Sequence, residues 1–321
     1  MKRMLSILLA LLFLLAGLAI FVAQPLFGVS YQARDRTVSP ASLSSHVLAL
    51  VRADKPRDAD HPENLEAAAA YIHHEFTRAQ GVVADQIFTA DAKNYRNVVA
   101  SFGPDTRERI VVGAHYDTHG PLPGADDNAS GVAGLIELAH LLGKTKLPMR
   151  VELVAYTLEE LPYFRTEQMG SQVHAARLKQ QGAQVRAMIS LEMIGYFSDA
   201  ADSQDYPIPL MKLIYPTRGN FISVVGKVGE GKLVRQVKRA MQIAAPLPVY
   251  SINAPSVIPG IDFSDHQSYW KLGYPAVMVT DTAFYRNHNY HTEGDTPERL
   301  DYVRMAQVVE AVYAAVTELA R

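Results

Sequence analysis

Apolar positions recur along this chain in two rhythms, one typical of helices and one typical of strands. Over residues 61–81, Leu65, Ala68, Ile72 and Phe76 fall on one helical face and a glycine follows, which predicts an amphipathic helix. Shorter runs rich in Val and Ile, bounded by Gly, Pro or charged residues, predict strands instead. The two kinds of segment alternate along the chain, so each predicted strand has a helix close to it in the sequence.

The same periodicity of apolar positions predicts the full set of helices and strands. Helices are expected over residues 40–51, 61–81, 128–144, 169–182, 230–244 and 295–321. Strands are expected over residues 83–89, 95–102, 109–114, 151–157, 185–191, 221–228 and 275–280. Strands that alternate with helices predict a three-layer α/β domain with a largely parallel sheet. No internal repeat and no second domain is visible in the pattern.

Two helix starts carry side chains that suit an N-cap. We expect Asn128 or Ser130 to cap the helix over 128–144, and Asp295 or Thr296 to cap the last helix. In contrast, the Pro-rich stretch 200–220 shows no clear period. Because it directly follows a predicted strand, we expect it to form a wall of a pocket.

The N-terminus is an apolar run of membrane-spanning length. Lys2 and Arg3 precede an uncharged stretch from Met4 to Ala23, and twenty helical residues cover about 30 Å, the thickness of a bilayer core. The two cations favour a cytoplasmic N-terminus. An uncleaved anchor and a cleaved signal peptide both fit, because small residues near position 19 permit cleavage.

Either interpretation places the rest of the chain outside the cytoplasm. We therefore divide the sequence into a signal anchor or signal peptide (1–28), a stalk with a first helix (29–60) and the α/β domain (61–321). The working domain is expected to be membrane-anchored, or periplasmic or secreted after cleavage.

Composition narrows the chemistry further. The 321 residues are 48% apolar and 20% charged, with a formal net charge of −2, so no basic excess indicates a nucleic-acid partner. The chain contains no cysteine, which excludes thiol nucleophiles, disulfides and Cys-type zinc sites. Any metal site must be built from His, Asp and Glu. The oligomeric state leaves no signal in the sequence.

Metal-binding residue types follow several predicted strands at their carboxyl ends. Ligands of open α/β sheets bind at that edge, so these side chains are expected to converge. They are His115, Asp117, Asp126, Asp127, Glu159, Glu160, Glu192 and His291. Two histidines with several carboxylates and no cysteine are typical of paired zinc ions, in which one carboxylate bridges the metals.

The motifs resemble those of the co-catalytic di-zinc exopeptidases, a family that includes bacterial leucyl aminopeptidases, aminopeptidase Y and plasma glutamate carboxypeptidase. The matching stretches are "GAHYDT", "GADDNASGVAGLIELA", "TLEELPYF", "SLEMIGY" and "NYHTEGDTPERLDY". The resemblance runs from about residue 60 to the C-terminus. It implies an α/β/α sandwich with a mixed, mostly parallel central sheet of about eight strands, two zinc ions and a peptide substrate.

The resemblance also implies roles for individual residues. His115 and Glu192 would bind one zinc, Glu160 and His291 the other, and Asp127 would bridge them. Of the remaining groups, Asp117 would orient His115 by a hydrogen bond, Glu159 would be the general base, and Tyr290 would approach the oxyanion.

Other polar side chains near these motifs received no catalytic role. Asp126 is left without one, and the other histidines, His119 among them, read as surface or core residues. The stretch 264–270 contains Asp265 and His266, which look like ligands, but the resemblance implies that it only lines the site.

One departure from the family pattern affects substrate choice. Glu192 stands where bacterial aminopeptidases usually carry Asp, and the extra methylene leaves open whether the enzyme reads the amino or the carboxyl end of a peptide. An aminopeptidase is the leading hypothesis. A glutaminyl cyclase, a carboxypeptidase or amidase of the same fold, and a catalytically silent receptor-type binding domain remain as alternatives.

Overall fold

The centre of the fold is one sheet of eight strands. The computed structural model describes residues 2–33, 37–52 and 55–321. The strands are β1 (Val82–Ala90), β2 (Lys93–Phe102), β3 (Glu108–His115), β4 (Arg150–Tyr156), β5 (Gln184–Glu192), β6 (Ile222–Lys227), β7 (Val249–Ala254) and β8 (Ala276–Thr280). Their order in the sheet is β1-β2-β4-β3-β5-β8-β6-β7.

The sheet is mixed, with its parallel part in the middle. Strands β4, β3, β5 and β8 run parallel to one another, while β1 and β2 join antiparallel on one side and β6 joins antiparallel on the other. Strand β7 then pairs parallel with β6. Of the eight residues of β3, seven are buried, as expected of a parallel strand covered on both faces. The carboxyl ends of the four central strands therefore meet at one edge.

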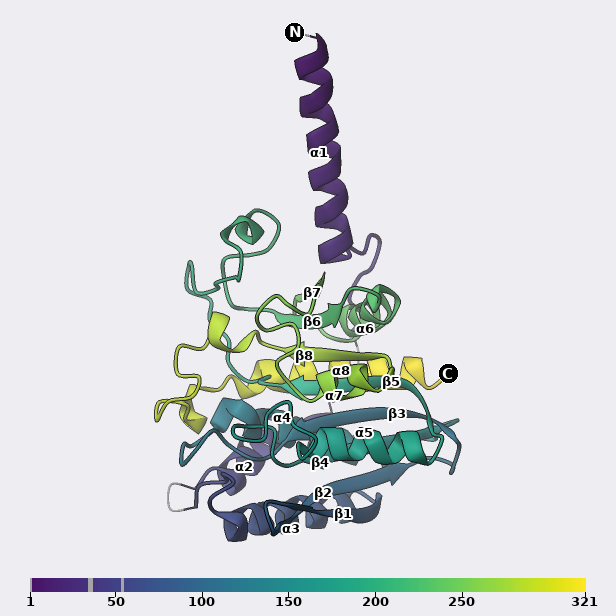
Figure 1. Ribbon diagram of the computed structural model, residues 1–321, viewed down its shortest axis with the longest axis vertical. Coiled ribbons are helices and arrows are strands. Elements are labelled where there is room, and N and C mark those ends of the chain that lie inside the picture. Colours follow the sequence, from purple (N-terminus) through teal and green to yellow (C-terminus); the bar gives the residue numbers. More distant parts are fainter. Residues whose placement is uncertain (1, 34–36, 53–54) are drawn as a thin grey trace.

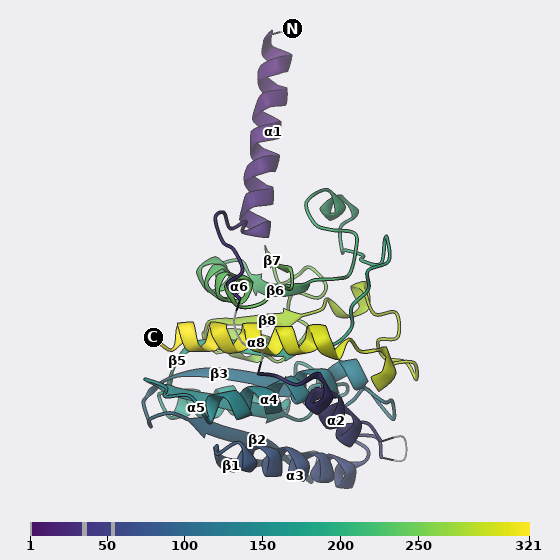
Figure 2. The same cartoon turned by 180° about the vertical axis from the view of Figure 1, so that it is seen from behind.

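Helices cover both faces and complete the expected three-layer sandwich (Figures 1 and 2). One face carries α2 (Pro40–Leu50), α3 (Pro62–Arg78), α4 (Gly131–Leu142), α6 (Gly231–Ala244) and α8 (Tyr302–Leu319), and the other carries α5 (Gly170–Gln180) and α7 (His266–Lys271). Shorter helical turns are η1 (Ala125–Ser130), η2 (Pro209–Leu213), η3 (Ala283–Tyr285) and η4 (Pro297–Arg299).

Two apolar clusters form the core, one on each face of the sheet. The larger lies under α2, α3, α4, α6 and α8, and the smaller lies under α5 and α7. A close approach in the centre requires glycine: a Cβ on Gly113 of β3 would lie 2.1 Å from the ring of Tyr156 on β4. The Tyr156 hydroxyl hydrogen-bonds that of Tyr269 on α7 at 2.7 Å, which ties α7 to the sheet.

Helix α1 (Lys2–Ala23) projects away from the domain (Figure 1). Residues Arg3–Ala23 are long and apolar enough to cross a membrane, with a mean hydropathy of 3.0, and none of that window is buried against the fold. By contrast, α2 buries Leu43 and Val47 in the larger core, although we grouped it with the stalk.

The structure corrects the start of one helix and adds two elements. The last helix starts at Tyr302, not near 295, because Asp301 is its cap and accepts a hydrogen bond from the Arg304 amide at 2.9 Å. Strand β7 and helix α7 were not predicted. At the start of helix α4, the Gly131 amide donates to Asn128 Oδ1 at 3.1 Å, so of the two expected capping residues Asn128 makes the bond.

Candidate active site

The expected ligand residues converge where the central parallel strands end. His115 is the last residue of β3 and Glu192 the last of β5, while Glu159 and Glu160 follow β4 by three and four positions. These strands are neighbours in the order β4-β3-β5, and parallel neighbours deliver their carboxyl ends to one edge. Asp127, in the loop after β3, completes this group of five residues, and each of them is less than a tenth exposed.

One group of ligand atoms gathers around His115. Its Nε2 lies 3.3 Å from Asp127 Oδ1 and 3.4 Å from Glu192 Oε2. The same Glu192 oxygen accepts a hydrogen bond from Ser264 Oγ at 2.7 Å. We call His115, Asp127 and Glu192 the first cluster; their ligand atoms are close enough together to surround one metal ion.

A second group gathers around His291, which comes from the loop after β8. His291 Nε2 lies 3.0 Å from both Asp127 Oδ2 and Glu160 Oε1. His119 Nδ1 lies 3.4 Å from Glu160 Oε2, and the rings of His119 and His291 stack at 3.9 Å. We call His119, Glu160 and His291 the second cluster, and they could also hold a metal ion.

Asp127 joins the two clusters. Its Oδ1 faces His115 of the first cluster and its Oδ2 faces His291 of the second. Burial alone would raise the pKa of Asp127, but hydrogen bonds to His115 and His291 lower it below its usual value. A carboxylate that presents one oxygen to each of two histidine-bearing clusters is placed as a bridging ligand would be.

Asp117 supports both clusters without belonging to either. His115 Nδ1 donates to the Asp117 backbone carbonyl at 3.2 Å and lies 3.5 Å from Asp117 Oδ1. The Glu160 amide donates to Asp117 Oδ2 at 3.0 Å. Because Nδ1 is engaged in this way, Nε2 of His115 is left to face the first cluster.

Glu159 lies beside the first cluster, but it is not one of the residues that form it. Its Oε2 is 4.0 Å from His115 Nε2, farther than the oxygens of Asp127 and Glu192. Burial raises the pKa of Glu159 well above its ordinary value, and the neighbouring Glu160 and Glu192 raise it further against the effect of His115. A carboxyl group with a raised pKa near such a centre is suited to accept and donate a proton.

Tyr290 packs directly on this centre. Its ring stacks on that of His291 at 3.7 Å. Burial raises the pKa of the Tyr290 hydroxyl, and the carboxylates of Asp127 and Glu160 raise it further. The hydroxyl therefore keeps its proton and is available as a hydrogen-bond donor.

The charges of the site fit bound cations. Asp127, Glu159, Glu160 and Glu192 bring four buried carboxyl groups to a space with three histidines. Burying an excess of negative charge is unfavourable unless it is paired with cations or binds metal. Burial and the Asp127 carboxylate raise the pKa of Glu192, which reflects this excess. Nitrogen and oxygen donors without sulfur suit zinc.

Two aspartates hold the loop that carries Asp127. The sequence predicted a different role for one of them and no role for the other. Asp295, expected as a helix cap, instead accepts the Asp126 and Asp127 amides at 3.0 Å each. Asp126 accepts the Gly195 amide and the Asn287 side-chain amide, both at 3.0 Å. These bonds connect segments more than sixty residues apart and fix the backbone on which Asp127 sits.

His119 was expected to be an ordinary histidine, and the structure places it in the second cluster. Its spacing, two residues beyond Asp117 and four beyond His115, is the one available sequence signal. His266 behaves as expected of a residue that only lines the site: its Nε2 bonds the Ile261 carbonyl at 2.8 Å, and burial lowers its pKa to about 4. The buried Asp265 belongs to neither cluster.

An apolar pocket opens beside Glu192. Segment 204–215 forms one wall, as expected for the Pro-rich stretch, and contributes Tyr206, Met211 and Tyr215. The remaining lining is largely aromatic and aliphatic and comes from the loops after β7 and β8 and from the sheet itself: Phe221, Val225, Tyr250, Ile252, Ile261, Phe263, Met278 and Phe284. Such a lining suits an apolar side chain.

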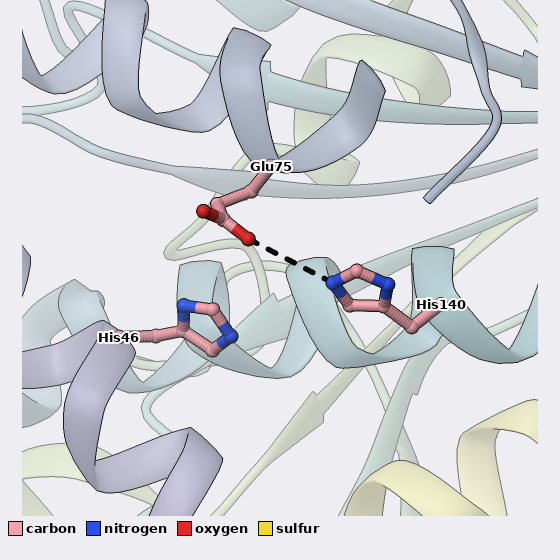
Figure 3. Close-up of side chains that lie close together, drawn as sticks. All are labelled: His46, Glu75 and His140. Carbon is pink, nitrogen blue, oxygen red and sulfur yellow. Dashed lines mark ion pairs between the residues drawn. The ribbon is translucent and has the colours of Figure 1, made fainter. Parts of the chain in front are cut away.

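A cavity of about 730 Å³ lies elsewhere, between α2, α3, α4 and α8. Figure 3 shows His46, Glu75 and His140 on its wall, with His140 Nε2 3.8 Å from Glu75 Oε2. His46 is also bonded to Tyr71 and Glu137, and Glu75 to Arg78. These partners satisfy one another, so we assign the chemistry to the two joined clusters and not to this cavity.

Solved structures of known proteins share the fold. Legionella pneumophila LapA aminopeptidase superposes with a TM-score of 0.67 at 22% identity, covering 90% of this chain and 78% of that one. Porphyromonas gingivalis glutaminyl cyclase superposes with a TM-score of 0.65 at 21% identity, covering 88% and 99%. The resemblance in fold therefore includes both an aminopeptidase and a cyclase.

Relatives in sequence show to which protein family the chain belongs. The chain is 49% identical over 285 residues to the uncharacterized protein YfbL of Escherichia coli, across 86% of this chain and 87% of that one. It is 27% identical to a probable leucine aminopeptidase 1 of Trichophyton verrucosum, across 70% of this chain and 58% of the fungal protein. The pattern of Peptidase family M28 matches residues 97–316. With its two joined clusters of histidine and carboxylate side chains, the chain belongs to peptidase family M28 and is a metallopeptidase.

Proposed function

We propose that this enzyme is a zinc aminopeptidase that holds two zinc ions and removes N-terminal residues with apolar side chains. The observation that carries the proposal is the placement of Asp127 between His115 and His291, with one oxygen toward each. A site for a single ion would not need a carboxylate shared between two clusters. His115 and Glu192 would hold one ion, and Glu160 and His291 the other, with Asp127 shared and His119 adjacent.

The residues around the two ions would then have separate tasks in the reaction. Zinc ions at these positions would supply positive charge that activates water and stabilises the oxyanion formed at the peptide carbonyl. Glu159, with its raised pKa, would take the proton from the attacking water and pass it to the leaving amine. The Tyr290 hydroxyl, which stays protonated, would donate a hydrogen bond to the oxyanion.

The free amino group of the substrate needs negative charge to hold it. Glu192 belongs to the first cluster and Glu159 lies beside it; both carboxyl groups are buried and could pair with an ammonium group. Glu192 also lines the apolar pocket. When it holds the ammonium group of the first substrate residue, the side chain of that residue would enter the pocket and contact Met211, Tyr215 and Phe221. This arrangement favours peptides with a free N-terminus and a large apolar first residue.

Matched peptides test the assignment. We expect release of N-terminal Leu from a free peptide and loss of most activity on its N-acetylated twin, because acetylation removes the charge that Glu159 and Glu192 would pair with. A third peptide that starts with Asp should also be cleaved poorly. Equal cleavage of the free and acetylated peptides would refute the aminopeptidase assignment and favour an amidase or carboxypeptidase.

A second activity has a specific observation behind it, namely the shared fold with a glutaminyl cyclase. Incubation with a peptide that starts with Gln separates the two. Cyclisation of that residue without release of free amino acid would support the cyclase, whereas release of free Gln would support the aminopeptidase.

We further propose that α1 stays attached as a membrane anchor and that the catalytic domain lies outside the cytoplasm. The helix is apolar and lies apart from the core, and Lys2 and Arg3 precede it. Cations on the N-terminal flank favour an orientation in which the chain after the helix is exported.

A further inference from the structure

Helix α1 is fastened to the domain by buried polar contacts at its C-terminal end. Lys238 Nζ on α6 donates to the carbonyls of Ala23 and Gln24 at 3.1 Å each, and Ser251 Oγ on β7 donates to the Ala23 carbonyl at 2.9 Å. The Gln24 side chain, only 5% exposed, bonds Arg235. The point at which α1 leaves the domain is therefore fixed beside α6 and β7, at one edge of the sheet.

This attachment decides which side of the domain faces a bilayer that contains α1. A helix of this length would place Ala23 at the outer membrane surface. The α6–β7 edge, from which α1 emerges, would then lie nearest the lipid, and β1, at the other end of the strand order, would lie farthest away (Figures 1 and 2).

A second apolar element projects from the same side. We call residues 206–215, which contain the short helix η2, the η2 loop. Its large apolar side chains are exposed: Leu213 is 79% exposed, Leu210 63% and Ile208 47%. In both views this green loop extends beyond the domain to the level of the last turns of α1 (Figures 1 and 2). Exposed apolar side chains gathered in one segment are typical of a contact surface.

The outward face of α6, next to α1, is cationic. Lys232, Arg235 and Arg239 are exposed and recur at helical spacing, and α6 contains no acidic residue. Within the part of the chain that the structure describes, none of the three forms a salt bridge with an acidic side chain. A row of cations beside a membrane helix is complementary to anionic lipid headgroups.

We propose that the η2 loop and the cationic face of α6 rest on the membrane surface beside α1, with the tip of the η2 loop inserted among the lipid headgroups. This inference rests on the proposed anchoring of α1 and not on the proposed peptidase specificity. An apolar tip and a basic helix face are the two components by which proteins bind anionic interfaces. They flank the point at which the anchor enters the bilayer.

Insertion of the η2 loop would also affect how substrates reach the site. Met211 and Tyr215 of the η2 loop also line the apolar pocket beside Glu192. Insertion of the loop tip would place the mouth of that pocket at the lipid surface. Peptide substrates would then approach the site along the membrane surface.

Single-cysteine labelling of the full chain tests the contact, since the chain has no native cysteine. Leu213→Cys and, as a matched control, Val82→Cys would each carry an environment-sensitive fluorophore. Val82 is 75% exposed and lies on β1, at the opposite edge of the sheet. Both proteins are reconstituted in phosphatidylglycerol-containing vesicles with and without nitroxide-labelled lipid.

We expect the label at Leu213 to shift to shorter wavelength and to be quenched by the nitroxide lipid, and the label at Val82 to do neither. Equal behaviour of the two labels in a chain that resists carbonate extraction would overturn the proposal. A chain that has lost α1 and is released from membranes would overturn the anchoring itself. Neither result touches the peptidase assignment, which the acetylated peptide tests separately.

Charge-reversal variants of α6 provide a second, independent experiment. Charge reversal by Lys232→Glu with Arg239→Glu should reduce quenching at Leu213 in phosphatidylglycerol vesicles and leave it unchanged in zwitterionic vesicles. Lys93→Glu is the control and should change nothing, because this exposed lysine starts β2, next to the edge strand farthest from α6. Full quenching in the α6 variant would show that the cations do not contribute. Loss of quenching in the Lys93 variant would refute a local contact.

Discussion

Substitution of Glu159 by Gln separates catalysis from metal binding in this site. Glu159 Oε2 is 4.0 Å from His115 Nε2, whereas the cluster residues Asp127 and Glu192 approach the same nitrogen to 3.3 and 3.4 Å. Gln has nearly the same size and shape as Glu, so it should fill the same buried space and the variant should fold normally. It cannot take up a proton as the carboxylate does.

The expected magnitude follows from that single loss. A general base contributes ~10²–10⁴-fold to the rate, which corresponds to about 3 to 5 kcal/mol of activation free energy. We expect kcat to fall by this factor while the zinc content stays that of the wild type. The pH profile provides a further check: the wild-type kcat/KM should fall at acid pH as the Glu159 carboxylate takes up a proton, and this acid limb should disappear in the variant.

The matched control is Glu160→Gln. Glu160 lies 3.0 Å from His291 Nε2 and 3.4 Å from His119 Nδ1, so its loss should remove metal together with activity. Elemental analysis and single-turnover kinetics on both variants measure the two effects. Loss of zinc from the Glu159 variant with retention in the Glu160 variant would show that the two roles are reversed.

Three further predictions concern support of the site and stability. Asp117→Asn should weaken zinc affinity about 10–100-fold, measured by competition with a chelator, and an unchanged affinity would contradict its orienting role. Leu43→Ala should lower the free energy of unfolding by about 2–5 kcal/mol, because this α2 side chain is fully buried; a loss near zero would mean that α2 is dispensable. Burial lowers the pKa of His174 to about 3, so the neutral form stabilises the fold above pH 6.5 and that contribution is lost as pH falls towards 3. The decline in stability over this range should be shallower in His174→Gln, and equal slopes would argue against a buried neutral histidine.

The strands and their metal-ligand ends were predictable because both signals are local. Val- and Ile-rich runs mark β3, β4, β5 and β8, and the carboxyl ends of parallel strands meet at one edge whatever the loops do. His115, Glu160 and Glu192 therefore converge in the structure as expected. Strand β7 was missed because polar Ser251 and Asn253 occupy buried positions, so its sequence shows no clear apolar alternation. The six residues of α7 are too few to show a helical period.

The supporting residues were not predictable, because their roles depend on contacts far away in the sequence. Asp295 looked like a helix cap, but it binds the amides of Asp126 and Asp127, about 170 residues earlier. Asp301 performs the capping instead. His119 joins the second cluster only because the loop after β3 folds back over Glu160. Apart from the spacing of His119 from His115 and Asp117, no local pattern distinguishes these residues from ordinary histidines and acids.

The number of zinc ions per chain tests the central claim most directly. The wild-type enzyme, loaded with zinc and freed of excess metal, should contain two ions by elemental analysis. Asp127→Asn, which removes the carboxylate between His115 and His291, should bind both more weakly. Chelation should abolish cleavage of a free Leu peptide, and added zinc should restore it. One ion per chain in the active wild-type enzyme, or full activity after complete removal of metal, would contradict the two-zinc account.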